Sequence, residues 1–430
     1  MDVVGWGSVM AVASTVLFPA QRRNQPHVHA RRDAARALLR DPVFYLGAAL
    51  LAFMAFQALN NGRPEVYNVS GARWARGAPP WPGFPSSLDA GAAWRLFFTF
   101  LPAVAAALCA RHGMAFQGRF FYLGMLACLS ALVAAWEVGV SAALGGRTDG
   151  WRVFANADHG GVWFLLCLGV SVALWGRACA SGQPSWARGV FLACAFLNVA
   201  GMRALRAPAA LWLAGCAGVP LAWATLAVAW KSLAPARRAA ALAVLGGVLP
   251  LVVFGAALGT PRVESGPPPR MDAGEGRKLK MDAAWKMAAD HRLYGVGGGN
   301  YPRFAAAYWP AGLIREYRLA GIMKDNEPAP WMLVADNDYA QALAEFGVAG
   351  ASIMLAAWFV LLRPAWRGWR GATAAGKCLC VVFLAGVGLV FAAAWAGSPL
   401  RSPPVLVSVA AALACAPAFL LNPLGGDDAA

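Results

Sequence analysis

Asp336, Asn337 and Asp338 form a polar run directly before an apolar stretch of the chain. Two carboxylates and an amide at such a place are candidates for chemistry at the edge of a membrane. Asx side chains also begin helices, because their oxygen accepts hydrogen bonds from unpaired backbone N–H groups. The two roles are compatible, since the positive end of the helix that follows also attracts anions. We therefore expect a helix to start here, with Asp336 or Asn337 as its cap.

Three arginines are candidates for binding an anion. Arg203 and Arg206 are three positions apart, so they share a helical face. Guanidinium groups bind phosphate through paired hydrogen bonds, so the two could clamp a phosphate-bearing lipid headgroup. The alternative is that they anchor the chain at the membrane interface. Arg277 begins a predicted helix in a long polar loop, where the alternative role is a solvated surface charge.

The segment Gly295–Asn300 reads GVGGGN. It lacks the Lys-Ser/Thr pair of a P-loop and the preceding strand of a dinucleotide fold. We expect a helix stop and a tight turn, whose backbone amides can face an anion. Asp158 and His159 precede another apolar run, a placement more typical of a helix cap than of a metal site. No group of residues has metal-ligand spacing, so neither a metal nor a cofactor is expected.

The elements that must position these residues are membrane spans. The 430 residues are 59% hydrophobic and 13% charged, whereas soluble domains carry about a quarter charged residues. Roughly 20 apolar residues are enough to cross a bilayer as a helix. The sequence therefore predicts an all-α polytopic transmembrane bundle of about 11 spans. They are expected at residues 3–20, 42–59, 92–109, 120–140, 160–176, 189–202, 208–230, 239–258, 346–362, 378–397 and 404–421.

The basic residues of the connecting segments predict the orientation. Segment 21–41 carries six arginines against two aspartates, so the positive-inside rule places it in the cytoplasm. Alternation puts four more segments on that side: 110–119, 177–188, 231–238 and 363–377. These five hold 17 of the 37 Lys and Arg residues. The N-terminus is expected outside and the C-terminus inside. Most of the net charge of +16 then faces anionic lipid, and nucleic acid is not an expected partner.

The spans divide the chain into four parts. Residues 1–258 hold spans 1–8, residues 259–345 form an external loop, residues 346–421 hold spans 9–11, and residues 422–430 form a cytoplasmic tail. The loop carries 11 basic and 11 acidic residues, and a structureless loop of that length would be unusual. Within it we expect a helix from Arg277 to His291, a glycine-rich turn, a short helix and a return helix from Asp338. The loop is therefore expected to form a small α-helical cap that carries the chemistry.

Three segments of the chain resemble motifs of the O-antigen ligase and polymerase superfamily. The family signature is His-Asn-Asp/Glu-Tyr-Leu-Gln followed by Leu-Ala-Glu-x-Gly-x-x-Gly, and ADNDYAQALAEFGVAG is similar to it. The segment DHRLYGVGGGNY resembles the family's upstream glycine-rich motif, and FANADHGGVWF resembles the start of a middle span. The likeness covers roughly residues 150–360. The matching residues are Asn337, Asp338, Tyr339, Gln341, Glu345, Gly347, Gly350, His291, Gly295, Gly297, Gly299, Asn300 and Tyr301.

The resemblance implies a metal-independent glycosyltransferase of the bacterial cytoplasmic (inner) membrane that acts on its outer face. The implied donor is a glycan on undecaprenyl pyrophosphate, and the acceptor is a hydroxyl of a glycan, a lipid or a protein. Arg277, with Arg203 or Arg206, is implied to bind the pyrophosphate. Asp336 occupies the position of the family's catalytic histidine, which acts on the acceptor hydroxyl. The other implied substrate-binding residues are His291, Asn300, Tyr301, Asn337 and Tyr339.

Two other functions are compatible with the composition. A carrier or a lipid-linked-sugar flippase would have ionisable residues at the middle of the bilayer and internal repeats. No repeat is found, and only Glu137 comes near, toward the end of a span. The second alternative is a family member that binds a lipid-linked glycan without transferring it, because an aspartate replaces the usual histidine. The sequence does not distinguish a polymerase from a ligase.

Overall fold

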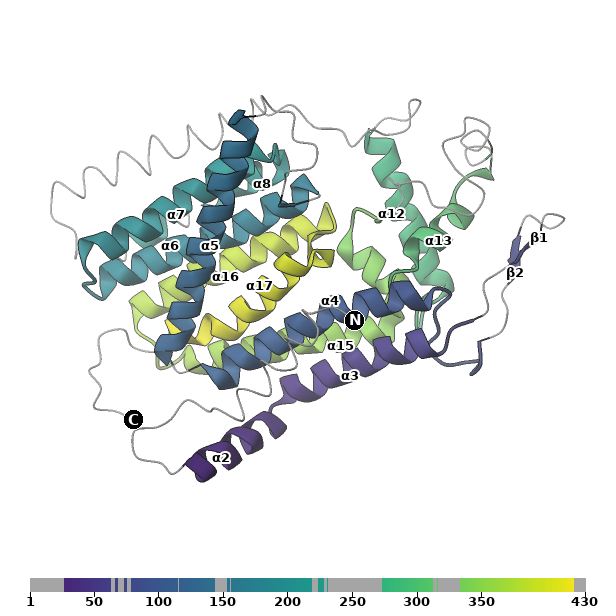
Figure 1. The fold of residues 1–430 in the computed structure, drawn as a ribbon, viewed down its shortest axis with the longest axis horizontal. Coiled ribbons are helices and arrows are strands. Elements are labelled where there is room, and N and C mark those ends of the chain that lie inside the picture. The colour runs from purple at the N-terminus through teal and green to yellow at the C-terminus, as the bar shows by residue number, and fades with distance from the viewer. Residues whose placement is uncertain are drawn as a thin grey trace.

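The computed structural model describes residues 27–62, 66–68, 73–75, 79–114, 116–143, 153–154, 156–218, 223–227, 230, 273–311, 315 and 333–420. This part of the chain is an all-α bundle of long helices with a group of short helices at one end (Figure 1). The predicted spans 3–20 and 239–258 and the tail 422–430 lie outside the described residues.

Seven of the described helices are long and apolar enough to cross a membrane. Each of them lies on a predicted span, and the predicted limits of the span 42–59 are those of its helix. The protein is therefore a polytopic helical membrane protein. These helices are α3 (Pro42–Leu59), α4 (Ala90–Leu108) with the π-helical segment η1 (Cys109–Gly113), α5 (Phe116–Ala143), α6 (Ala157–Ala180), α7 (Ser185–Ala204), α15 (Asp338–Gly368) and α16 (Ala374–Trp395).

Shorter elements complete the described bundle. Helix α17 lies on the last predicted span, and α8 and η2 lie on the predicted span 208–230. An antiparallel ribbon of two short strands pairs Tyr67 with Trp74 in a connection where no strand was predicted. These elements are α2 (His27–Leu39), β1 (Val66–Asn68), β2 (Arg73–Ala75), α8 (Pro208–Leu213), η2 (Ala214–Gly218), η7 (Pro399–Arg401), α17 (Pro403–Cys415) and η8 (Ala416–Phe419).

Helix α6 is the centre of the bundle. It packs against α5, α7 and α16, and 89% of its most apolar stretch is buried, against 28–50% for the other long apolar helices. A helix that is apolar on all sides is expected in such a place. Small residues allow the close approach: a Cβ atom on Gly169 of α6 would lie 2.8 Å from the Cα atom of Gly386 of α16. This close contact holds α6 against α16 in the middle of the bundle.

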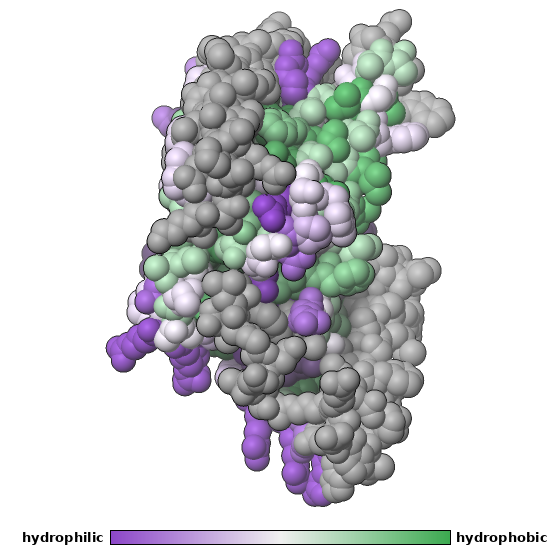
Figure 2. All heavy atoms as spheres, turned by 90° about the vertical axis from the view of Figure 1, so that its left-hand side faces the viewer, coloured by the Kyte–Doolittle hydropathy of each residue, from purple (hydrophilic) through white to green (hydrophobic). Residues whose placement is uncertain are grey.

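Three connections that were predicted to share one side, α4 to α5, α6 to α7 and α15 to α16, lie together at one end (Figure 1). Buried Asp41, which precedes α3, joins α3 to η1 there by binding Arg111 (2.6 Å) and His112 (2.6 Å). Burial alone would raise the pKa of Asp41, but the hydrogen bonds from His112 and Arg111 hold it well below its usual range. Figure 2 views the molecule from this side and shows hydrophilic residues projecting at the edges.

A cap of short helices lies at the opposite end of the bundle (Figure 1). It consists of α12 (Ala273–Asp290), the glycine-rich turn, α13 (Tyr301–Ala305) and η5 (Ala306–Tyr308), so the expected helices are present. The cap has its own small hydrophobic core, which includes Ala340 and Ala344 from the first turns of α15. The other members of this core are Ala283, Ala284, Met287, Val296, Tyr301, Ala305, Trp309 and Ala335.

Candidate functional site

The glycine-rich turn holds the two halves of a broken helix. Helix α15 is interrupted at Gly347, whose φ of 61° and ψ of −170° are not helical. A Cβ atom at Gly347 would lie 2.4 Å from the carbonyl carbon of Leu293, so only glycine fits here. Such a break leaves backbone groups without helical partners. The turn supplies them in four backbone hydrogen bonds: Val296 N–H to Ala344 O, Gly297 N–H to Glu345 O, Val348 N–H to Arg292 O and Ala349 N–H to Leu293 O.

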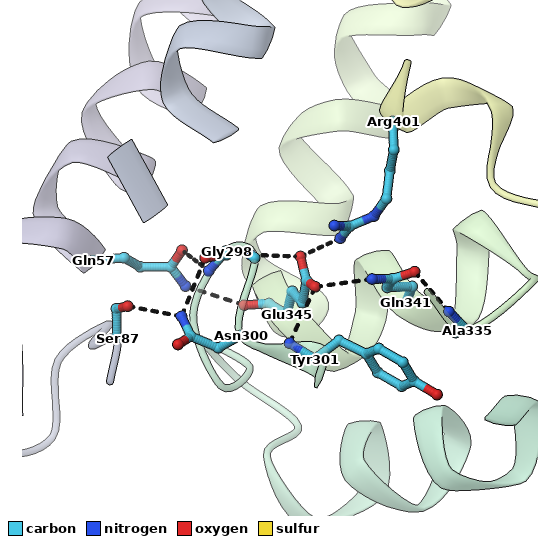
Figure 3. A network of polar contacts seen from close by, with 10 residues as sticks. Gln57, Ser87, Gly298, Asn300, Tyr301, Ala335, Gln341, Glu345 and Arg401 are labelled. Carbon is cyan, nitrogen blue, oxygen red and sulfur yellow. Dashed lines mark hydrogen bonds and ion pairs between the residues drawn. The ribbon is translucent and has the colours of Figure 1, made fainter. Parts of the chain in front are cut away.

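The side chain of Glu345 is fully buried at this junction and is the centre of a polar network (Figure 3). Its carboxylate accepts hydrogen bonds from Gly299 N–H (2.8 Å), Tyr301 N–H (3.3 Å) and Gln341 Nε2 (3.1 Å). It also forms an ion pair with Arg401 of η7. The amides of the glycine-rich turn thus face an anion, and this anion is the protein's own carboxylate.

Two further amide side chains tie the turn to the transmembrane helices (Figure 3). Gln57 of α3 donates to the backbone oxygens of Tyr294 (3.0 Å) and Glu345 (3.2 Å), and it accepts from Gly298 N–H (3.1 Å). Asn300 donates from Nδ2 to Ser87 Oγ (2.8 Å). Its Oδ1 accepts from the backbone N–H of the residue that caps α4, at 3.0 Å. The glycine-rich turn is therefore joined to α3 and to the segment before α4, in addition to the link through Glu345 to Arg401 of η7.

Asn337, and not Asp336, caps α15. Its Oδ1 accepts hydrogen bonds from the backbone N–H groups of Tyr339 (3.0 Å) and Ala340 (2.9 Å). Asp336 stands one position earlier with a φ of 53°, in the left-handed region that aspartate enters more readily than most residues. Its carboxylate forms an ion pair with Lys280 of α12, and its side chain is 27% exposed. The carboxylate of Asp336 is thus not used in capping and is open to the outside of the protein.

Ionisable side chains from α6 lie near Asp336. Its carboxylate interacts electrostatically with Asp158 and His159 at the start of α6. Arg277 of α12, which is exposed, interacts with Asp158, and Arg401 interacts with His159. The structure thereby brings the predicted residues Asp336 and Arg277 into one cluster with the two residues that begin α6.

The turn that holds Arg203 and Arg206 packs against the start of α6. Cβ atoms placed on Gly160 and Gly161 would lie 2.4 Å from Leu205 Cδ1 and 2.3 Å from Ala207 Cβ. Arg203 is exposed and Arg206 is half-buried. The φ of Arg206 is 56°, which makes it, beside Asp336, the other non-glycine residue with positive φ in the described chain. This conformation costs of order 1–3 kcal/mol and is often found at functional sites. The arginines thus lie next to the cluster, although no contact joins them to Asp336.

The other residues that were predicted to bind substrate form hydrogen bonds within the protein itself. Asn300 and Asn337 are fully buried, with the partners given above. Tyr301 is also fully buried, and its hydroxyl donates to the backbone oxygen of Lys280 (2.8 Å). Burial and the neighbouring carboxylates raise the pKa of this phenol. The hydroxyl of Tyr339 donates to Phe391 O (2.7 Å). We assign these four residues a positioning role.

His291 lies at the end of α12, with its ring 6.0 Å from that of Phe304. It does not take part in the network around Glu345 or in the contact between Asp336 and Lys280. Among the described residues, no group of three or more His, Cys, Asp and Glu side chains could hold a metal ion.

Sequence reasoning did not single out Lys280, Arg401 or Gln57, which are central to the observed contacts. Lys280 follows Arg277 by three residues, so a helical wheel of α12 places both on one face. Arg401 is a basic residue in a short connection on the side that was predicted to carry few of them. Gln57 is a polar residue within an apolar span. These features could have drawn attention to the three residues, but their partners are far away in sequence.

The chain matches no protein-family model, and no curated protein matches it in sequence.

Proposed function

We propose that the protein is a membrane glycosyltransferase of the O-antigen ligase and polymerase type. In this proposal it transfers a glycan from undecaprenyl pyrophosphate to a hydroxyl group, at the outer face of the bacterial cytoplasmic membrane. The observation that carries the proposal is the state of Asp336. This carboxylate is partly exposed, is not used as a helix cap and forms an ion pair with Lys280 of α12, near Asp158 and His159 of α6.

The arrangement supports a single displacement at the anomeric carbon of the donor sugar. Asp336 takes the proton of the acceptor hydroxyl as that oxygen forms a bond to the anomeric carbon. The bond from this carbon to the pyrophosphate oxygen breaks, and its electron pair leaves with the pyrophosphate. Negative charge therefore develops on the leaving group, and fixed cations beside it lower the barrier. Arg277 is exposed and can take this role, and the Arg203–Arg206 turn offers further guanidinium groups at the same edge of the bundle.

An apolar groove supports a substrate that carries a long lipid chain. The groove has a volume of about 860 Å³ and runs between α4 and α5, with α6 and α17 as its floor. Two of its residues, Met125 and Leu129, are more than half exposed on the outer face of α5, where lipid would surround the bundle. One of its lining residues, Pro403, lies two positions after Arg401, which interacts with His159 of the charged cluster. The groove is lined by Arg95, Phe98, Thr99, Pro102, Tyr122, Met125, Leu126, Leu129, Trp163, Pro403, Pro404, Val407 and Ser408.

The test is glycan transfer by the purified protein in lipid vesicles, with a lipid-linked oligosaccharide as donor. Asp336→Asn should fold normally, because Asn337 provides the cap, and should lose transfer by on the order of 10²–10⁴-fold, the usual contribution of a positioned base. Asp336→His should retain more activity than Asp336→Asn, because imidazole can also accept the proton. Asp290→Asn, a change at an exposed carboxylate of α12, is the matched control.

The outcomes separate the candidate functions. Transfer by Asp336→Asn at the parental rate would show that Asp336 is not the base. Binding of the donor without transfer by the wild-type protein would favour the non-catalytic alternative. Movement of the intact donor across the vesicle membrane, with no glycan transferred, would favour a flippase.

A further inference from the structure

The ion pair between Lys280 and Asp336 occupies both side chains in the substrate-free protein. The side chains of Lys280 and Asp336 are 13% and 27% exposed. The position of Lys280 on α12 is itself fixed, because its backbone oxygen accepts a hydrogen bond from the hydroxyl of buried Tyr301 (2.8 Å). A carboxylate held by an ammonium group is hindered from turning toward an acceptor hydroxyl.

Two cations of α12 lie near two carboxylates, one of them at the start of α6. Arg277 and Lys280 lie one turn apart on α12, Arg277 interacts with Asp158, and Lys280 binds Asp336. The two carboxylates also repel each other. An incoming pyrophosphate carries more negative charge than either carboxylate, so it competes with both for the same two cations. Lysine suits such an exchange, since its ammonium is a point charge on a flexible stem, whereas an arginine fork would hold its partner more rigidly.

We propose that Lys280 is a positioning residue that releases the base when the donor binds. Lys280 holds Asp336 in the empty site and moves to the donor pyrophosphate in the complex, so Asp336 is free to accept a proton only when a donor is present. This device rests on the proposed function. It prevents an exposed base at the membrane surface from acting on bound hydroxyl groups in the absence of a donor.

A binding experiment tests the exchange without requiring transfer. Farnesyl pyrophosphate serves as the probe, and its affinity for the detergent-solubilised protein is measured by calorimetry. Lys280→Met should weaken binding by on the order of 10-fold, the usual worth of a charge-assisted contact. Asp336→Asn should strengthen binding by a similar factor, because Lys280 no longer has a competing partner. In the Lys280→Met background Asp336→Asn should raise the affinity for the probe by less than about 2-fold, because Asp336 no longer competes with the probe for Lys280. The exposed Lys278→Met is the control on the same helix.

The split between KM and kcat provides the second readout. Lys280→Met should raise KM for the donor, because the cation that binds the pyrophosphate is lost. It should change kcat less, because Asp336 is already free of Lys280 in the donor complex. Lys280→Arg keeps the charge and should fold, with a lower kcat because its fork retains Asp336.

Each result decides one of the two proposals. If the wild-type protein transfers no glycan, the proposed function fails, whatever the binding data show. If it transfers glycan but Asp336→Asn raises the probe affinity equally with and without Lys280, then Lys280 does not exchange Asp336 for the pyrophosphate, and its proposed role is wrong. An unchanged KM for the donor in Lys280→Met would also overturn it, because it would show that Lys280 does not move to the donor.

Discussion

Glu345→Gln is the sharpest test of the network that joins the cap to the bundle. The change keeps the shape of the side chain but replaces one acceptor oxygen by an NH₂ group. In the structure both oxygens are used, by Gly299 N–H, Tyr301 N–H, Gln341 Nε2 and Arg401. The variant therefore turns an NH₂ group toward a donor and leaves Arg401 without its carboxylate.

The expected cost follows from the burial of the pair. Glu345 is 0% exposed and Arg401 is 20% exposed, so water cannot fully replace the lost partner. Removing one member of a buried ion pair costs about 3–5 kcal/mol. At roughly 2 °C per kcal/mol for a large chain, this corresponds to a melting temperature lower by about 6–10 °C.

The measurement is thermal unfolding in detergent, followed by tryptophan fluorescence. Glu275→Gln, a change at an exposed carboxylate of α12, should stay within about 0.5 kcal/mol of the parent. Arg401→Gln should also destabilise the protein, and the double variant should cost less than the two single changes together. A melting temperature for Glu345→Gln within about 2 °C of the parent would refute the reasoning, as would simple additivity with Arg401→Gln.

Three further predictions concern the anion site, the end of the bundle near α2, and the orientation. Arg277→Lys should impair transfer almost as much as Arg277→Ala, because lysine lacks the bidentate fork; full transfer by Arg277→Ala, at an unchanged protein level in the membrane, would exclude the role. Asp41→Asn should lower the melting temperature at pH 7. This difference should shrink below about pH 4. A carboxylate whose pKa is lowered by folding stabilises the protein above its unfolded pKa, and this effect is lost as the pH falls through the folded pKa. An equal difference at all pH values would contradict the ion-pair account. Reporter fusions after residues 32 and 377 should report cytoplasm and one near residue 276 should report the outside; a cytoplasmic signal at 276 would remove the donor from reach.

The helices of the bundle follow from the length of the apolar runs. An apolar run must be long enough to cross the bilayer and must satisfy its own backbone groups as a helix, so its limits follow from composition. The span predicted at 42–59 has these limits in α3, and Asp338 begins α15 as expected. The helix of the cap was also predictable, since the polar segment after residue 276 has helix-forming residues and ends in glycines.

The contacts of the candidate site were not predictable in the same way. Asp336 and Asn337 are adjacent and both suit a cap, so only the observed backbone geometry identifies Asn337 as the acceptor. The partners of Glu345 come from α3, the glycine-rich turn and η7, and no periodic pattern connects such distant positions. Nor did the sequence predict the break at Gly347, because a single glycine is tolerated within a helix at a modest cost.

The partners of Glu345 are synthesised in a fixed order. Gln57 and the glycine-rich turn are synthesised before Glu345, and Arg401 is synthesised after it. During that interval the nascent chain holds an acidic group at the membrane boundary without its cation, which is costly. Arrival of the connection before α17 completes the network, so the cap is fully joined to the bundle only after this late segment has been translated.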